Sequence, residues 1–300
     1  MGAALIAAAA AGSPAFAQDI EAPDGDERPP EAVPPGAAKA RTPDPDRVTW
    51  SVGATAVGKY ISRGVAFSEE PSLQPFASAR IALPELEGGA LTGVTAFVGT
   101  WNSIQSGGPG LGQANDGPVP GWYEADIYTG VALTFRERFT VSLAWYRYIS
   151  PADSFTDYDD FEMILRFDDT QFWEGRVPLD NFTLSPSLRM VQEEGQPLRD
   201  DALYVQPSLT PSFTVGTETP VTVSVPLMIG LSDSFYRGVD GGNPDFGFFR
   251  TGVTLAISPI EAVPALSFNG GVDVWMLNDD VANGLDDNEF IGRIGARYSF

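Results

Sequence analysis

The chain has 300 residues and neither cysteine nor histidine, and its 40 acidic and 18 basic side chains give a formal net charge of −22. Without histidine, it cannot build a Ser-His-Asp triad, a histidine-bearing zinc site or a histidine general base. Its acidity excludes the basic footprint of a nucleic-acid-binding protein. We therefore expect no nucleic acid partner, no metal site and no cofactor.

The first 46 residues predict export rather than a folded domain. Residues 1–17 combine an alanine-rich apolar run with Ala15-Phe16-Ala17, a small-x-small cleavage site, as a signal peptide does. Residues 18–46 hold seven prolines among Asp, Glu and Ala, which predicts a disordered periplasmic segment acting as a tether or a spacer. No later apolar run approaches the roughly 20 residues of a membrane-spanning helix.

From residue 47 onward, apolar and polar residues alternate with a period of two, as in strands. About twelve segments follow this pattern, near 48–60, 72–83, 90–101, 122–135, 138–149, 159–167, 182–191, 202–215, 220–230, 246–257, 265–276 and 288–300. Each has close to the ~9–11 residues of a tilted membrane strand. We predict an all-β single domain over residues 47–300, an antiparallel transmembrane β-barrel of about 12 strands, with ten or fourteen strands or a soluble β-sandwich as alternatives.

The lengths of the connectors between these segments alternate as well. Short ones (84–89, 136–137, 216–219 and 258–264) alternate with long ones (102–121, 150–158, 231–245 and 277–287), and the long connector 168–181 is the exception. Bacterial outer-membrane barrels have short periplasmic turns and long outer loops. The pattern predicts the outer membrane of a Gram-negative cell, both termini in the periplasm, and contact with outer-membrane lipid and lipopolysaccharide.

The last segment, NEFIGRIGARYSF, has one apolar face and one face that carries Glu289, Arg293 and Arg297. Lipid on one side and water on the other suit such a strand. The chain ends on Phe300, with Tyr298 two positions earlier. This ending resembles the C-terminal signal that the barrel assembly machinery reads in outer-membrane barrels, which implies that machinery as a partner.

Five prolines conflict with the predicted strands, because proline cannot donate a hydrogen bond to a sheet and a closed barrel has no edge strand. They are Pro75, Pro186, Pro207, Pro211 and Pro226. We expect bulges or strand ends there, or misplaced boundaries in the seventh to ninth segments.

The polar faces of the predicted strands would line the barrel lumen. They carry Glu124, Asp126, Glu162, Arg166, Arg250, Arg293 and Arg297. In a twelve-stranded barrel, Glu124 and Asp126 would lie opposite Arg250, and such opposed charges across water set selectivity. The alternative is an interior filled by its own side chains, in which these groups pair.

Other acidic groups give weaker signals. Glu124 and Asp126 could be an acid/base pair as in glycoside hydrolysis, but this spacing is common, so we expect no enzyme. The loops 153–160, 233–245 and 279–289 offer oxygen ligands that calcium or magnesium prefers, without EF-hand spacing. We interpret them as solvated acidic loops.

Four short motifs in residues 60–151 resemble the TorF-like family of outer-membrane porins. They are Tyr60-Ile61-Ser62-Arg63-Gly64 (Y-x-x-R-G), Gly99-Thr100-Trp101-Asn102 (G-x-W-x), Glu124-x-Asp126-x-Tyr128-x-Gly130 (E-x-D-x-Y-x-G) and the aromatic run Trp145-Tyr146-Arg147-Tyr148 before Pro151. The proline-rich segment before residue 47 and the irregular connector 168–181 depart from that family. The resemblance implies a porin barrel without enzymatic residues.

Together these features predict a porin-like channel for passive diffusion of small hydrophilic or charged solutes. The alternative is a non-conducting barrel that acts as a surface binding or structural protein through its acidic loops. A hydrolase that uses Glu or Asp is a third, weaker hypothesis. A homo-oligomer is compatible with either barrel, and the sequence does not choose a solute.

Overall fold

The structure of the protein is a computed structural model that describes residues 47–108, 117–195, 201–217, 219–236, 242–259, 263, 265–281 and 287–300. The predicted signal peptide (1–17) and disordered segment (18–46) lie outside the described residues, as do residues 109–116, 196–200, 218, 237–241, 260–262, 264 and 282–286, including parts of the acidic loops 233–245 and 279–289. In the described part, no helix has the length and apolarity needed to cross a membrane.

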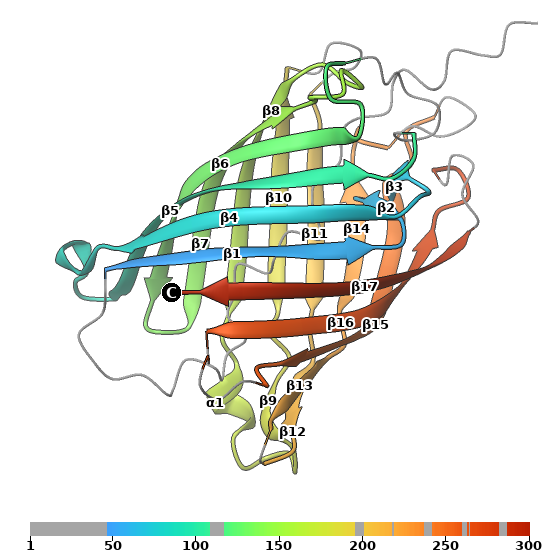
Figure 1. Cartoon of the computed structure of the whole chain (residues 1–300). Coiled ribbons are helices and arrows are strands. Elements are labelled where there is room, and N and C mark those ends of the chain that lie inside the picture. Colours follow the sequence, from blue (N-terminus) through green and yellow to red (C-terminus); the bar gives the residue numbers. More distant parts are fainter. Residues whose placement is uncertain are drawn as a thin grey trace, which may run out of the picture.

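Within the described residues, twelve antiparallel strands form a closed barrel (Figure 1). In ring order they are β1 (Val48–Val57), β4 (Ser72–Ala82), β5 (Leu91–Gln105), β6 (Trp122–Phe135), β7 (Phe139–Ile149), β8 (Tyr158–Phe167), β10 (Ser187–Glu194), β11 (Leu203–Leu209), β14 (Leu227–Ser232), β15 (Phe246–Ile257), β16 (Leu266–Leu277) and β17 (Asn288–Ser299). The ring closes where β17 pairs with β1. The predicted twelve-stranded barrel is confirmed, and the sandwich and the other strand numbers are wrong.

Seven shorter elements complete the described chain. They are β2 (Tyr60–Ser62), β3 (Val65–Ser68), the 3-10 turn Pro84–Leu86, α1 (Thr170–Trp173), β9 (Asp180–Thr183), β12 (Ser212–Val215) and β13 (Val221–Ser224). The predicted first strand, 48–60, was too long, because β1 ends at Val57 and Tyr60 starts a separate hairpin.

Three of the five prolines interrupt neighbouring strands at one level of the wall. Pro186 separates β9 from β10, Pro211 separates β11 from β12, and Pro226 separates β13 from β14. Beyond this line β12 pairs with β9 and β13, and β13 pairs with β15. These short strands and α1 extend past the ends of their neighbours (Figure 1).

The other two prolines stay inside strands that lose pairing on one side only. Pro75 pairs with Ala54 of β1, while the ladder from β4 to β5 skips it. Pro207 pairs with Leu188 of β10, while the ladder from β11 to β14 skips it. A closed barrel thus accommodates proline without an edge strand, because a local gap in one ladder removes the need for its missing N–H.

Side chains alternate between an apolar outer surface and a polar or packed interior. On β17, Phe290 and Ile294 are 70% and 67% exposed, whereas Ile291 between them is 1% exposed. Large exposed apolar side chains of this kind occur on strands all around the ring. An apolar outer band around a closed barrel is the surface that a lipid bilayer requires.

The two rims of the barrel differ in their connectors. We call the rim with residues 58–71, 150–157 and 278–287 the long-loop end, and the rim with residues 83–90 and 136–138 the short-turn end. The connector 168–179, which carries α1, is the long exception at the short-turn end, as the sequence indicated.

Candidate functional site in the barrel interior

The seven predicted lumen residues all lie on the inner faces of their strands, and they differ in burial. Glu124, Asp126, Glu162 and Arg250 are buried, and Arg166, Arg293 and Arg297 are partly exposed. The predicted assembly residues Tyr298 and Phe300 lie on the outer face, 39% and 57% exposed, with ring centroids 5.3 Å apart.

The interior of the long-loop half is occupied by the hairpin β2–β3, residues 60–68, which we call the inner hairpin. Its turn is made by Arg63 and Gly64, which have φ of +46° and +83°. Two successive residues with positive φ are characteristic of tight hairpin turns, and Gly adopts this conformation without steric cost. Tyr60, Ile61, Ser62 and Arg63 have no exposed surface.

Arg63 joins the inner hairpin to the wall through two buried ion pairs. Its Nη2 donates to Asp160 Oδ2 of β8 at 2.6 Å, and its Nη1 donates to Glu193 Oε1 of β10 at 2.8 Å. The guanidinium also lies 5.1 Å and 5.2 Å from the ring centroids of Tyr204 and Phe235. Burial by itself would lower the pKa of Arg63, but the two carboxylates raise it, so the charge is retained.

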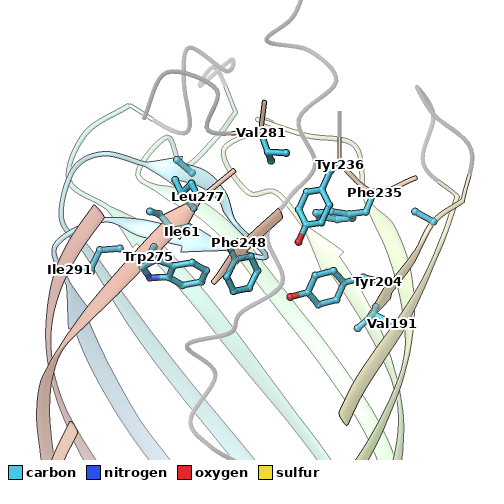
Figure 2. Packing of buried hydrophobic residues seen from close by; sticks show 12 residues of the cluster. Ile61, Val191, Tyr204, Phe235, Tyr236, Phe248, Trp275, Leu277, Val281 and Ile291 are labelled. Carbon is cyan, nitrogen blue, oxygen red and sulfur yellow. The ribbon is translucent and has the colours of Figure 1, made fainter. Parts of the chain in front are cut away.

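An apolar cluster surrounds the inner hairpin on the side of β15, β16 and β17. Ile61 of the hairpin packs with Phe248, Trp275 and Ile291, and Figure 2 shows these three side chains extending from the wall strands into the barrel. Phe248 and Trp275 have ring centroids 4.7 Å apart. The hairpin backbone comes so close that a Cβ on Gly64 would lie 2.8 Å from the Phe248 ring.

A second aromatic cluster holds the other side of the inner hairpin. Tyr60 and Phe67 pack with Phe76, Trp101 and Tyr123 from the wall. The Tyr60 hydroxyl lies 3.5 Å from Glu124 Oε2, which places the hairpin directly against the predicted acidic wall. The long-loop half is therefore a packed core inside the barrel, and its packing element comes from residues 58–71.

The buried Arg189 and Arg250 and the partly exposed Arg293 of the wall have carboxylate partners close by. Arg250 Nη2 donates to Asp273 Oδ2 on the adjacent β16 at 3.0 Å, and Arg293 Nε lies 3.2 Å from the same oxygen. Arg189 Nε lies 2.5 Å from Glu162 Oε2. β6 and β15 are six strands apart in the ring, as predicted. The prediction set Glu124 and Asp126 on β6 against Arg250 on β15. The structure adds the carboxylate of Asp273 beside Arg250, and it places the inner hairpin with its Arg63 between the two strands.

Sequence reasoning missed several of these residues. The sequence points to Arg63 only through the Y-x-x-R-G resemblance and to Asp160 only as the last residue of the acidic loop 153–160, and it gives no signal for Arg189, Glu193 or Asp273. Alternation could have placed Asp160 on the face of Glu162, but it could not show that residue 63 reaches them, because that contact depends on the path of the loop. Of the acidic loops, 153–160 is described; its Asp157 and Asp159 pair with Arg147.

No family model matches the chain, and no curated protein matches it. The chain is similar in structure to the COG4313 outer membrane channel from Pseudomonas putida F1 (8% identity, 86% of this chain and 97% of that chain, TM-score 0.47). It is also similar to the transport unit of the autotransporter AIDA-I from Escherichia coli (12%, 85% and 91%, 0.42) and to the translocator domain of the autotransporter NalP from Neisseria meningitidis (11%, 86% and 90%, 0.42). The TorF-like resemblance stays a prediction.

Proposed function

We propose that the protein is an outer-membrane channel for small hydrophilic or charged solutes, and that the inner hairpin closes it in the conformation described here. The observation that carries this proposal is the division of one barrel interior into a half packed around the inner hairpin and a half lined by partly exposed polar side chains. If the inner hairpin left the interior, the half lined by polar side chains would open towards the long-loop end.

The proposed location in the outer membrane of a Gram-negative cell has two supports. The outer face of the barrel exposes large apolar side chains around the ring, which a soluble monomer rarely does. The C-terminal Tyr298 and Phe300 add to that face and fit recognition by the barrel assembly machinery. The long-loop end would face the cell exterior and lipopolysaccharide, with both termini in the periplasm.

The second candidate is a non-conducting barrel that binds a partner or supports the envelope. The complete burial of Arg63 between two carboxylates favours it, since a charged residue in that environment leaves its partners only at a large cost. A hairpin that never leaves would make the barrel a rigid plugged cylinder.

Planar-bilayer recordings separate these two functions. We compare the wild-type chain with a variant in which residues 60–68 are replaced by Gly-Ser-Gly, both refolded and both checked for heat-modifiable migration. We expect small or rare conductance steps from the wild type and larger, salt-dependent steps from the variant. Lys59→Ala is the matched control, because Lys59 is the partly exposed residue next to the hairpin and pairs with Glu289 at 2.8 Å.

A folded hairpin-replacement variant that shows no conductance steps, or only steps as small and rare as those expected of the wild type, would overturn the channel and support the non-conducting barrel. Equal, large steps from all three proteins would instead show that the hairpin does not close the lumen.

A further inference from the structure

The charges inside the barrel differ between its buried and its partly exposed positions: the buried ones include both carboxylates and arginines, such as Arg189 and Arg250, whereas the partly exposed ones on the ring strands are arginines. Every inward carboxylate of the twelve ring strands is buried in the described structure: Glu124, Asp126, Asp160, Glu162, Glu193, Asp273 and Glu289. All seven lie in the long-loop half or at its boundary. Among the described residues, the partly exposed inner positions of these strands therefore include no carboxylate.

The partly exposed inward charges of the same strands are arginines. They are Arg80 on β4, Arg166 on β8, and Arg293 and Arg297 on β17. β8 and β17 are six strands apart in the ring, so Arg166 lies across the lumen from Arg293 and Arg297. Arg293 also lies 3.2 Å from the buried carboxylate of Asp273, so the positive charge on opposite sides of this space comes mainly from Arg166 and Arg297.

The arginines are accompanied by neutral hydrogen-bonding groups. Thr254 and Asn269, on β15 and β16, are inward and partly exposed. Arg293 Nη2 donates to Thr254 Oγ1 at 2.5 Å, which fixes its guanidinium at the inner end of this space. At the short-turn rim, the carboxylate of Asp169 accepts hydrogen bonds from Trp173 and from the N–H groups of Leu184 and Ser185, so its oxygens are already engaged.

We propose that the short-turn half of the lumen is a vestibule that concentrates and binds small anions of the carboxylate or phosphate class. Guanidinium groups bind such anions through paired N–H donors, and low-dielectric walls strengthen the local field. The chain as a whole carries a net charge of −22, so this vestibule has the opposite sign to the molecule. We infer the anionic class of the solute from the arginines. The inner hairpin bounds the vestibule on the long-loop side.

This inference deepens the proposed function, since it concerns the same lumen, but anion binding in the vestibule does not require conduction. The test can therefore be independent of the bilayer recordings. Because the chain has no cysteine, one introduced thiol is unique. Asn269→Cys places a thiol in the vestibule, and Thr254→Cys places a second one beside Arg293.

The experiment measures how fast each thiol, in the full chain in detergent micelles, reacts with an anionic and with a cationic methanethiosulfonate reagent. Rates are divided by those of a small free thiol to remove the intrinsic reactivity of the two reagents. We expect an anionic preference of roughly tenfold or more at Asn269→Cys, the scale at which fields in charged clefts act on ions. Gly88→Cys is the outside reference, because a Cβ at Gly88 meets nothing within 4 Å.

Two arginine variants on the Asn269→Cys background identify the source of the field. Arg166→Gln with Arg297→Gln should remove most of the anionic preference, whereas Arg297→Lys should keep it. Heat-modifiable migration identifies folded barrels, and inorganic phosphate should slow the reaction at Asn269→Cys but not at Gly88→Cys.

Three results would overturn the proposal: no anionic preference at either vestibule thiol, a preference that survives the double Gln substitution, or folded barrels whose vestibule thiols react with neither reagent. An anionic preference in a barrel that never conducts would keep the vestibule and reject the channel.

Discussion

The two halves of the barrel interior are built on the same strands but have opposite characters. β8 carries Asp160, fully buried in the long-loop half, and six residues later Arg166, which is partly exposed in the short-turn half. β17 repeats this order with Glu289 and Arg297. The difference shows that the wall strands alone do not decide whether a position is dry or wet. The inner hairpin decides it, because it covers one half only.

The largest expected loss of stability comes from removing the charge of Arg63, which holds the inner hairpin to the wall. Arg63→Ala leaves Asp160 and Glu193 buried without their guanidinium, which costs about 3–5 kcal/mol for a broken buried ion pair. We expect a matching drop in the free energy of unfolding by urea in micelles. Lys59→Ala should cost less, because the ammonium is partly exposed to solvent and only one carboxylate, that of Glu289, loses its partner.

A combined variant shows whether the cost comes from the stranded carboxylates. Arg63→Met with Asp160→Asn and Glu193→Gln should be more stable than Arg63→Ala, because the buried charges are gone. If the triple variant were no more stable than Arg63→Ala, the hairpin would be held mainly by its apolar contacts.

A smaller loss of stability is expected from a substitution at Gly130, near the middle of β6. A Cβ on Gly130 would lie 2.3 Å from the carbonyl oxygen of Leu143 and 2.5 Å from the Phe97 ring. Gly130→Ala should therefore cost about 1–3 kcal/mol through overpacking, measured by the same urea titration. Gly88→Ala, in open space, is the matched control, and equal losses at both glycines would contradict the close contact.

The smallest effect concerns acid pH at the short-turn rim. Partial burial raises the pKa of Asp169, but hydrogen bonds from Thr183, Trp173 and two backbone N–H groups outweigh it, so the pKa is lowered. Its contribution to stability is present above the unfolded pKa of about 3.9 and is lost as the pH falls through the folded value. Trp173 fluorescence should change below about pH 4, and Asp169→Asn should lack this change.

The barrel could be predicted from the sequence because the alternation of apolar and polar residues indicates which side chains of each strand face outward and which face inward. The sequence also indicates which prolines conflict with continuous strands. Strand ends were one of the expected outcomes, and the structure has them at Pro186, Pro211 and Pro226. Their alignment across three strands could not be predicted, because it depends on the register between strands far apart in sequence.

The interior was less predictable than the wall. The inward positions of Glu124, Arg250 and Arg297 follow from alternation, but their surroundings do not. Residues 58–71 look like an ordinary loop, and only the folded structure shows Arg63 reaching β8 and β10. Charge partners such as Asp273 likewise depend on which strands are neighbours.

The order of events in folding follows from where the inner hairpin sits in the chain. It directly follows β1, yet β1 must wait for β17, about 240 residues later, to close the ring, and Arg63 must wait for β8 and β10. Contacts so distant in sequence form slowly, since loop closure must precede them. We therefore expect the contacts of β1 with β17 and of Arg63 with β8 and β10 to form late, although β1 can pair earlier with the nearby β4, and until then the carboxylates of Asp160 and Glu193 lack their counterion.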